Sequence, residues 1–407
     1  MQNPNVIRDK KQEYIILLVL GTMIAIGPLS IDMYLPSFEH IATDFQTTKA
    51  QVGISLTSYF IGIALGQLAY GPVMDKFGRK IPLLIGLVIY VISALSCFYS
   101  PDIYWLIISR FFLAVGASAG MVAAKAVIRD IFPPEEVARA ISFLMLIMGA
   151  APIIAPTLGG MVIAYFNWEM IFMFLAIFAA LMFISVLLFL PESITPDKTV
   201  ELKYKQIFLK YKGILTDKMF FTFAMAGSLT IGAMFAYISN APILFMDRFG
   251  MSETEFAWFF GLNASGLILG SQLNRAILIR IKTFTLTLYI SYILVGLAIF
   301  LLLNSLFINS FYVTVILLFA ILFLLGFQNP NTTALSLFPF TKRAGRASAL
   351  VGSLKMCLGA ITSYIISKFT GISIVPMALT IFGCLFLSSF LLVRFKLKEK
   401  KAMLISD

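Results

Sequence analysis

The sequence predicts an all-α membrane protein of twelve transmembrane helices in two related six-helix halves. Of its 407 residues, 60% are apolar and only 13% are charged, whereas about 25% of residues are charged in a typical soluble domain. Apolar runs of about 20 residues recur along the chain, and each is long enough to cross a hydrocarbon layer of ~30 Å. Basic residues gather in every second segment between these runs. Together these features exclude a soluble globular protein.

The apolar runs define the predicted spans in order. The first contains Asp32 and is not followed by a small-residue cleavage site, so we expect a retained helix rather than a signal peptide. Polar segments separate the later runs. The twelve spans are expected at residues 14–35, 51–70, 81–99, 103–128, 138–163, 168–190, 219–246, 254–273, 283–303, 310–337, 347–367 and 372–393.

The distribution of charge orients these helices. Alternate segments hold 25 of the 31 Lys and Arg residues, while the opposite segments hold only Lys49, Arg248 and Lys368. Cytoplasmic loops of membrane proteins carry the excess of basic residues. We therefore expect both termini in the cytoplasm and a multi-pass protein of the bacterial inner membrane. This orientation accounts for the net charge of +11, and no nucleic-acid partner is expected.

A long polar stretch divides the chain into two halves. We predict an N-terminal bundle over 1–192, a cytoplasmic linker over 193–217 and a C-terminal bundle over 218–407. Within the linker, residues 204–211 have the pattern of a short amphipathic surface helix. The second and eighth spans end alike, with Gly66-Gln67-Leu68 in one and Gly270-Ser271-Gln272-Leu273 in the other. This echo predicts duplicated halves, an architecture that places a transporter's substrate site at the interface of its repeats.

Prolines interrupt the first, fifth, seventh and tenth spans. Such breaks are tolerated inside a membrane only where the freed backbone groups face protein or a wet cavity. These four spans are therefore expected to line a cavity. The prolines are Pro28, Pro36, Pro152, Pro156, Pro242 and Pro330.

The segment after the second span carries the most specific motif in the chain. It reads Gly71-Pro72-Val73-Met74-Asp75-Lys76-Phe77-Gly78-Arg79-Lys80, in which two glycines allow a tight turn and an acid and a base flank it. Its residue content alone is equally compatible with an ordinary basic loop. Its spacing resembles the signature loop between helices 2 and 3 of the major facilitator superfamily, which implies that superfamily's fold for this chain.

Further stretches resemble one branch of that superfamily, the Bcr/CflA-type drug:proton antiporters. They are Asp32-Met33-Tyr34-Leu35-Pro36, Arg110 with Gly116, Val127-Ile128-Arg129-Asp130, the run from Ala151 to Gly160, and Pro191-Glu192-Ser193. The resemblance implies proton coupling through Asp32 with support from Arg110, and no cofactor other than the coupling proton. It also identifies Pro152, Pro156, Gly159 and Gly160 as the antiporter motif, which is typical of exporters.

Ionisable residues inside spans are costly, so each needs a partner, water or a function. Asp32 is either an acid close to the membrane surface or a carboxyl that binds and releases the coupling proton. Arg110 stays charged at physiological pH, so we expect it to organise a polar network or to clamp backbone carbonyls. Lys125 lies one turn from a helix end and can extend its amine to the surface.

Lys355 departs from the resemblance, because the branch usually has an uncharged residue such as Gln at this position. It lies about eight residues into its span, or ~12 Å deep at 1.5 Å per residue. We expect it either to recognise an anionic group on the cargo or to counterbalance Asp32. A lysine here also argues against a simple exporter of cationic drugs.

Two groups of residues complete the predicted site. Charged residues of the cytoplasmic loops are expected to pair and so lock that side of the protein, and with the turn glycines they are Gly71, Asp75, Gly78, Arg79, Arg129, Asp130 and Arg139. The cargo pocket is expected to be apolar and aromatic with a few polar groups. Its candidates are Tyr34, Tyr59, Met121, Met145, Met148, Phe235, Tyr237, Asn240, Asn263, Gln328 and Lys355.

These observations favour a proton-coupled exporter of small amphipathic molecules, with multidrug efflux and antibiotic resistance as its biological role. The alternative is a dedicated exporter of one metabolite, such as an amino acid or a siderophore. The predicted spans contain no ring of charged residues, so a channel is not indicated. The sequence has no HExxH or GxSxG motif, a single histidine and no cysteine cluster, so no enzyme and no catalytic or metal site is expected. The expected partners are the lipid bilayer and a small-molecule substrate, and the protein is expected to act as a monomer.

Overall fold

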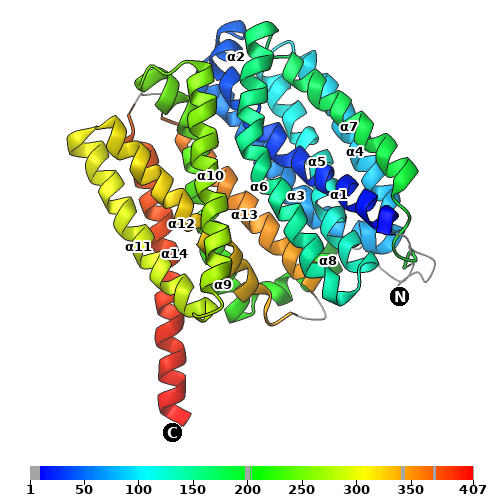
Figure 1. Ribbon diagram of the computed structural model, residues 1–407, viewed down its shortest axis with the longest axis vertical. Coiled ribbons are helices and arrows are strands. Elements are labelled where there is room, and N and C mark those ends of the chain that lie inside the picture. The colour runs from blue at the N-terminus through cyan, green and yellow to red at the C-terminus, as the bar shows by residue number, and fades with distance from the viewer. Residues whose placement is uncertain (1–9, 198–201, 203, 341–343, 370–372, 407) are drawn as a thin grey trace. The chain divides into compact units, whose positions relative to one another are not determined.

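The computed structural model describes residues 10–197, 202, 204–340, 344–369 and 373–406, except for the side chains of a few helical residues, Met145 among them. In these residues the chain is helical and forms no β-strand (Figure 1). It divides into two compact units. The first comprises residues 1–210 and 253–261, and the second comprises 211–252 and 262–407. The predicted bounds of the two bundles and the linker stay a prediction.

The first unit contains the elements up to the start of the amphipathic helix. Its first membrane-spanning segment is interrupted, because the α-helix stops at Asp32 and a 3-10 turn precedes a second short helix. The bounds are α1 Lys10–Asp32, η1 Leu35–Ser37, α2 Phe38–Asp44, α3 Lys49–Phe77, α4 Lys80–Phe98, α5 Ile103–Ile131, α6 Pro134–Tyr165 and α7 Met170–Phe189.

The second unit contains the remaining spans, except that residues 253–261, the start of the eighth span, belong to the first unit. The amphipathic helix predicted in the linker is present as α8, Tyr204–Leu215, which crosses the boundary between the units. In α9 the helix passes Pro242 and continues as one wide turn, η2. The bounds are α9 Lys218–Pro242, η2 Ile243–Arg248, α10 Glu253–Ile277, α11 Thr283–Leu303, η3 Asn304–Ile308, α12 Phe311–Leu337, α13 Ala344–Ser367 and α14 Val375–Ser406.

The two units repeat one packing pattern. In the first, α1 packs against α5, α6 and α7, while α4 packs against α5 and α7. In the second, α9 packs against α12, α13 and α14, while α11 packs against α12 and α14. The first and third spans of each unit thus pack against corresponding neighbours. This correspondence supports the duplicated halves predicted from the sequence echo.

The glycines of that echo have the same structural task. A Cβ on Gly66 of α3 would lie 2.0 Å from the Ser118 hydroxyl of α5. A Cβ on Gly270 of α10 would lie 1.9 Å from the carbonyl oxygen of Phe323 on α12. Both glycines let two helices approach more closely than a side chain allows, as small residues commonly do in membrane proteins. The repeated sequence therefore corresponds to the same close helix crossing in both units.

Eleven helices of the described chain are long and apolar enough to cross a membrane. The eighth predicted span, α10, does not reach the same hydropathy, because polar side chains such as Asn263, Gln272 and Asn274 interrupt it. It is nevertheless a 25-residue helix, and its Gly270 crossing matches that of α3. The all-α, twelve-helix architecture is confirmed.

Candidate functional site

A buried arginine lies at the centre of the first unit. Arg110 of α5 is fully buried, and its guanidinium carbon lies 3.9 Å from the ring centroid of Tyr34. The rings of Tyr59 and Phe172 follow at 5.2 and 5.8 Å. Aromatic faces attract cations electrostatically, more strongly where water is excluded. The three rings therefore form an aromatic cage that stabilises a charge in the membrane interior.

The hydrogen bonds of Arg110 are incomplete. Its Nη2 donates to the carbonyl oxygen of Ser30 on α1 at 3.1 Å. Its Nε and Nη1 atoms are buried and have no hydrogen-bond partner among the described residues. Because more than nine in ten buried polar groups in proteins are paired, two unpaired donors on one cation are unusual. They leave room for an acceptor that this structure does not supply.

Asp32 lies at the end of α1, two residues after the serine that Arg110 contacts. Its side chain is buried, with 4% of the residue exposed. Within the described chain, no hydrogen bond or ion pair joins Asp32 to Arg110. The structure thus places Asp32 and Arg110 at the same stretch of α1, with no bond between the two side chains.

Hydroxyl groups surround this region. The Tyr34 hydroxyl hydrogen-bonds to Ser55 at 2.9 Å, and the Ser30 hydroxyl hydrogen-bonds to Tyr90 at 2.7 Å. Tyr59 donates to the carbonyl of Gly27 at 3.4 Å, next to Pro28, which lies inside α1. Ser30, Ser55 and Tyr90 were not predicted from the sequence, because single hydroxyl residues within apolar spans form no recognisable pattern.

The second unit contains a lysine, Lys355, within a predicted span. Lys355 of α13 donates hydrogen bonds to Asn329 and, at 2.7 Å, to Thr333, one turn apart on α12. The preceding residue of α12, Gln328, is fully buried, and neither polar atom of its amide has a partner in the described chain. Lys355 is therefore held by α12, and the same helix carries a buried amide that has no hydrogen-bond partner in the described chain.

Asn263 of α10 resembles Gln328 in this respect. Its amide nitrogen donates to the Tyr237 hydroxyl of α9 at 2.9 Å. Its Oδ1 atom is buried and has no partner among the described residues. Arg110, Asn263 and Gln328 are all residues that the sequence predicted for the site, and the one other residue with such an atom in the described chain is Glu169. Unsatisfied buried groups thus coincide with the predicted site.

The remaining pocket candidates are distributed over both units. Met121 is buried on α5 and Met148 is half-buried on α6, whereas the Met145 side chain lies outside the described residues. In the second unit, Phe235 and Asn240 of α9 are buried. Phe235 packs where Gly359 of α13 leaves space, since a Cβ there would lie 2.5 Å from its ring.

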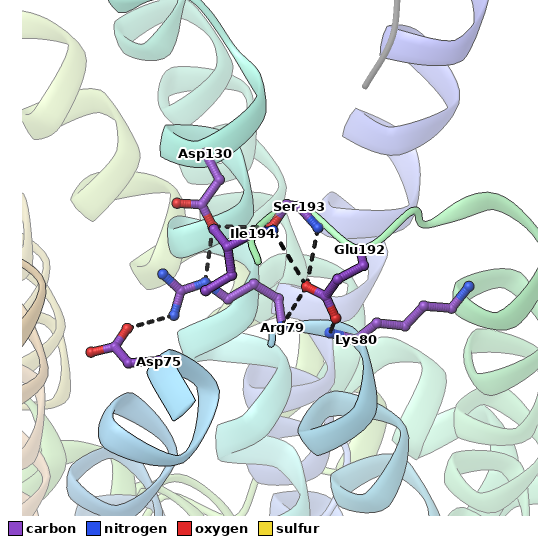
Figure 2. A network of polar contacts seen from close by, with 7 residues as sticks. All are labelled: Asp75, Arg79, Lys80, Asp130, Glu192, Ser193 and Ile194. Carbon is purple, nitrogen blue, oxygen red and sulfur yellow. Dashed lines mark hydrogen bonds and ion pairs between the residues drawn. The ribbon is translucent and has the colours of Figure 1, made fainter. Parts of the chain in front are cut away.

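The turn between α3 and α4 is organised by one arginine (Figure 2). Arg79 donates to Asp75, four residues earlier on α3, at 2.8 Å and to Asp130 at the end of α5 at 2.9 Å. Burial alone would lower the pKa of the Arg79 guanidinium, but its hydrogen bonds and charge interactions with Asp130 and Asp75 outweigh burial and raise that pKa. Arg79 therefore ties the ends of α3 and α5 together as a permanent cation.

Glu192 closes the same network from the end of the first unit. Its carboxylate accepts hydrogen bonds from the backbone N–H groups of Arg79 at 2.7 Å and Lys80 at 3.1 Å, at the start of α4. The Ser193 hydroxyl donates to Asp130 at 3.0 Å (Figure 2). An acid at a helix N-terminus satisfies orphan donors and complements the helix dipole. Pro191-Glu192-Ser193 was noted in the sequence as a resemblance, but its role at the α3–α4 turn was not foreseen.

Two expectations about this turn need correction. Gly71 was expected to form part of it, but α3 continues to Phe77, and only Gly78 has the positive φ of a turn, at +87°. The helix passes Gly71-Pro72 because its end is held by the Arg79 network. Arg129 and Arg139 were expected to join the charge cluster, but both are exposed, and the described ion pairs of Asp75 and Asp130 are with Arg79.

The antiporter motif lies within α6, where Pro152 and Pro156 are internal residues of the helix. Gly159 is buried, and a Cβ there would lie 2.2 Å from the carbonyl oxygen of Met33. The motif therefore brings α6 against the backbone next to Asp32. No group of three or more His, Cys, Asp or Glu residues able to hold a metal occurs in the part of the chain that the structure describes.

Comparisons with known proteins give relatives that match most of the chain. The family model described as Major Facilitator Superfamily matches residues 18–364. The uncharacterized MFS-type transporter YdgK of Bacillus subtilis (strain 168) is 33% identical over 377 residues, 91% of this chain and 93% of that protein. The bicyclomycin resistance protein homolog of Haemophilus influenzae is 28% identical over 384 residues, 93% and 96% of the two chains. The crystal structure of a D-xylose-proton symporter shares the fold, with a TM-score of 0.72, 16% identity and coverage of 93% and 97%.

Proposed function

The chain belongs to the major facilitator superfamily of membrane transporters, and we propose that it exports small amphipathic molecules in exchange for protons by alternating access. Its relatives support the drug:proton antiporter branch, since one is named a bicyclomycin resistance protein homolog. Superfamily membership establishes a transporter, not an enzyme. Because one fold serves many cargoes, the coupling ion and the direction of transport are argued from the site.

The observation that carries the proposal is the presence of two buried charged residues in the first unit that do not pair with each other. Asp32 and Arg110 are both buried, and both approach the last turns of α1. An ionised carboxyl without a partner costs several kcal/mol in the membrane interior. Binding a proton removes that charge, and contact with water or with the unpaired donors of Arg110 would stabilise the carboxylate after release.

This exchange gives the protein two states of different charge. In one, Asp32 holds a proton and Arg110 remains in its aromatic cage. In the other, Asp32 is ionised and the Nε and Nη1 donors of Arg110 are available to it. A ligand shifts a conformational equilibrium only by its differential affinity for the two states. Cargo that binds the ionised state would therefore promote proton release, which is the requirement for antiport.

The α3–α4 turn is proposed as the element that responds to this exchange. Arg79 joins α3 to α5 through Asp75 and Asp130, and Glu192 holds the start of α4. These ion pairs are partly buried, and a network acting together can bias two states that differ by a few kcal/mol. The strong basic asymmetry of the sequence supports a cytoplasmic location for this turn and for both termini.

Lys355 supports a second candidate, the export of one anionic metabolite such as an amino acid or a siderophore. The lysine donates hydrogen bonds to the neutral side chains of Asn329 and Thr333. Beside it, the Gln328 amide has no partner in the described chain. A carboxylate or phosphate on the cargo would complement both groups.

The experiment is transport by the purified protein in proteoliposomes with an imposed pH gradient, using ethidium and chloramphenicol as test cargoes. We expect the gradient to drive flux in the wild type and Asp32→Asn to abolish that response. Asp102→Asn is the matched control, because Asp102 is an exposed N-cap of α5 and Asn caps helices equally well. Cargo flux that does not depend on the pH gradient would contradict proton antiport. Gradient-driven flux that persists in Asp32→Asn would contradict coupling through Asp32.

A further inference from the structure

A groove runs along the outer face of the second unit between α11 and α14. It has a volume of about 280 Å³ and is lined by Tyr292, Val295, Phe386, Ser389, Phe390 and Val393. Tyr292, Phe386 and Phe390 expose 45%, 49% and 51% of their surface. The Ser389 hydroxyl hydrogen-bonds to Ser291 at 3.1 Å. The lining is therefore apolar and aromatic, and its one hydroxyl is already satisfied.

The surroundings of the groove are hydrocarbon rather than water. Both α11 and α14 are long and apolar enough to cross a membrane, and the lining residues lie within those spans. An open groove in a bilayer is filled by whatever lies beside it, because a void forfeits the dispersion contacts of its walls. The groove has no unsatisfied polar group to select a polar cargo. Its shape and chemistry fit an acyl chain.

One end of the groove is basic. Arg394 follows Phe390 by four residues and Lys396 follows Val393 by three, so both cations lie on the face of α14 that lines the groove. Phe284 near the start of α11 packs against Phe395, with ring centroids 5.9 Å apart, which brings the preceding Lys282 to the same end. Figure 1 shows α14 continuing past α11 as one helix toward the C-terminus.

Acids are scarce around these cations. Residues 278–303 and 375–398 contain neither Asp nor Glu, and the single acid of α14, Glu399, stands among Lys396, Lys398, Lys400 and Lys401. Lys282, Arg394 and Lys396 are all exposed, and the described ion pairs involve none of them. Clusters of Lys and Arg next to a membrane span attract anionic lipid headgroups.

We propose that the α11–α14 groove binds an anionic phospholipid, with an acyl chain against Phe386 and Phe390 and the phosphate against Arg394, Lys396 and Lys282. The lipid comes from the leaflet at the basic end of α14, which the charge distribution predicts to be the cytoplasmic one. It joins two helices of the second unit that pack side by side. This site is separate from the residues assigned to protons and cargo, so it stands whether or not the protein is an antiporter.

The test is native mass spectrometry of the full-length protein with added phosphatidylglycerol or phosphatidylcholine. We expect phosphatidylglycerol to bind in preference to phosphatidylcholine. Replacing Lys282, Arg394 and Lys396 by Gln should lower phosphatidylglycerol affinity by about fivefold per cation, the equivalent of ~1 kcal/mol for a basic side chain near an anionic surface. The double variant Arg129→Gln/Arg139→Gln, which removes exposed cations from the first unit, should bind as the wild type does.

A second variant tests the groove itself. Val295→Phe/Val393→Phe should fill it and reduce binding of both phospholipids. Because a filled groove could also disturb folding, a photoactivatable phosphatidylglycerol on the wild type provides an independent readout, with cross-links expected on α11 and α14. Equal binding of the two lipids, undiminished binding by the filled variant, or cross-links on other helices would overturn the proposal. So would displacement of the lipid by ethidium or chloramphenicol, because the groove would then be a cargo site.

Discussion

At the scale of single residues, the aromatic cage around Arg110 selects for the shape of the guanidinium as well as for its charge. The guanidinium carbon lies 3.9 Å from the ring centroid of Tyr34 and near two further rings. A planar, weakly hydrated cation stacks on aromatic faces, whereas the compact ammonium of lysine is strongly hydrated. The cage is therefore specific for arginine, and it retains the charge without an acidic partner.

Arg110→Lys should consequently destabilise the protein even though the charge is kept. Cation–π contacts contribute about 0.5–2 kcal/mol, and we expect a loss of roughly that size with a lower thermal unfolding midpoint in detergent. Gradient-driven flux should fall as well. Arg139→Lys is the matched control, because Arg139 is exposed. An unchanged midpoint and flux in Arg110→Lys would show that the cage has no energetic role.

Lys355→Gln should change which compounds are transported without removing proton coupling. The substitution deletes a positive charge beside Gln328 while leaving an amide that can still bond to Asn329 and Thr333. We expect the transport of anionic cargoes to fall relative to that of neutral or cationic cargoes. The measurement is growth inhibition of an efflux-deficient host across a compound panel. Thr333→Val, which removes one hydrogen-bond acceptor of the lysine but not its charge, is the comparison. An identical profile for wild type and Lys355→Gln would refute the role in cargo recognition.

At the scale of elements, the turn between α3 and α4 depends on one backbone conformation. Gly78 has φ +87° and ψ 174°, a region that side chains rarely enter. A Cβ there would also lie 2.5 Å from Glu192 Oε2. The glycine thus allows both the turn and the approach of the carboxylate that caps α4.

Gly78→Ala should therefore cost about 1–3 kcal/mol, the usual penalty for a strained backbone position. We expect a lower unfolding midpoint and reduced flux. Gly213→Ala on α8 is the control, because a Cβ there meets nothing within 4 Å and alanine favours helix. Equal behaviour of the two variants would mean that the turn tolerates a side chain.

At the scale of the whole molecule, the basic asymmetry predicts the orientation in the membrane. Two exposed positions on opposite predicted sides are Pro101, before α5, and Ile279, after α10. In a background with the exposed Cys357 replaced by serine, an impermeant maleimide added to intact cells should label Pro101→Cys and not Ile279→Cys. Permeabilised cells provide the control in which both should react. The reverse labelling pattern would place the termini outside.

The sequence by itself determined the twelve helices, the duplicated halves and the family, because span length, hydropathy and motif spacing are local properties of the chain. It also named Arg110, Asn263 and Gln328, the residues whose buried polar atoms lack partners. Helix ends were less accurately predicted. The second span was expected to stop at residue 70, yet α3 continues to Phe77, because the Arg79 network holds an end that its Gly-Pro pair would otherwise weaken.

Only the tertiary structure decided how these residues are partnered. The cage of Arg110 takes Tyr34, Tyr59 and Phe172 from separate parts of the chain, and Glu192 reaches the start of α4 from more than 100 residues away. Such contacts depend on which helix faces pack together, and helix packing is set by small residues such as Gly159 at close crossings. Periodicity identifies a helix and its polar positions, but it does not specify which polar groups meet. The physical reason is that burial and hydrogen bonding act between helices, after each helix has formed.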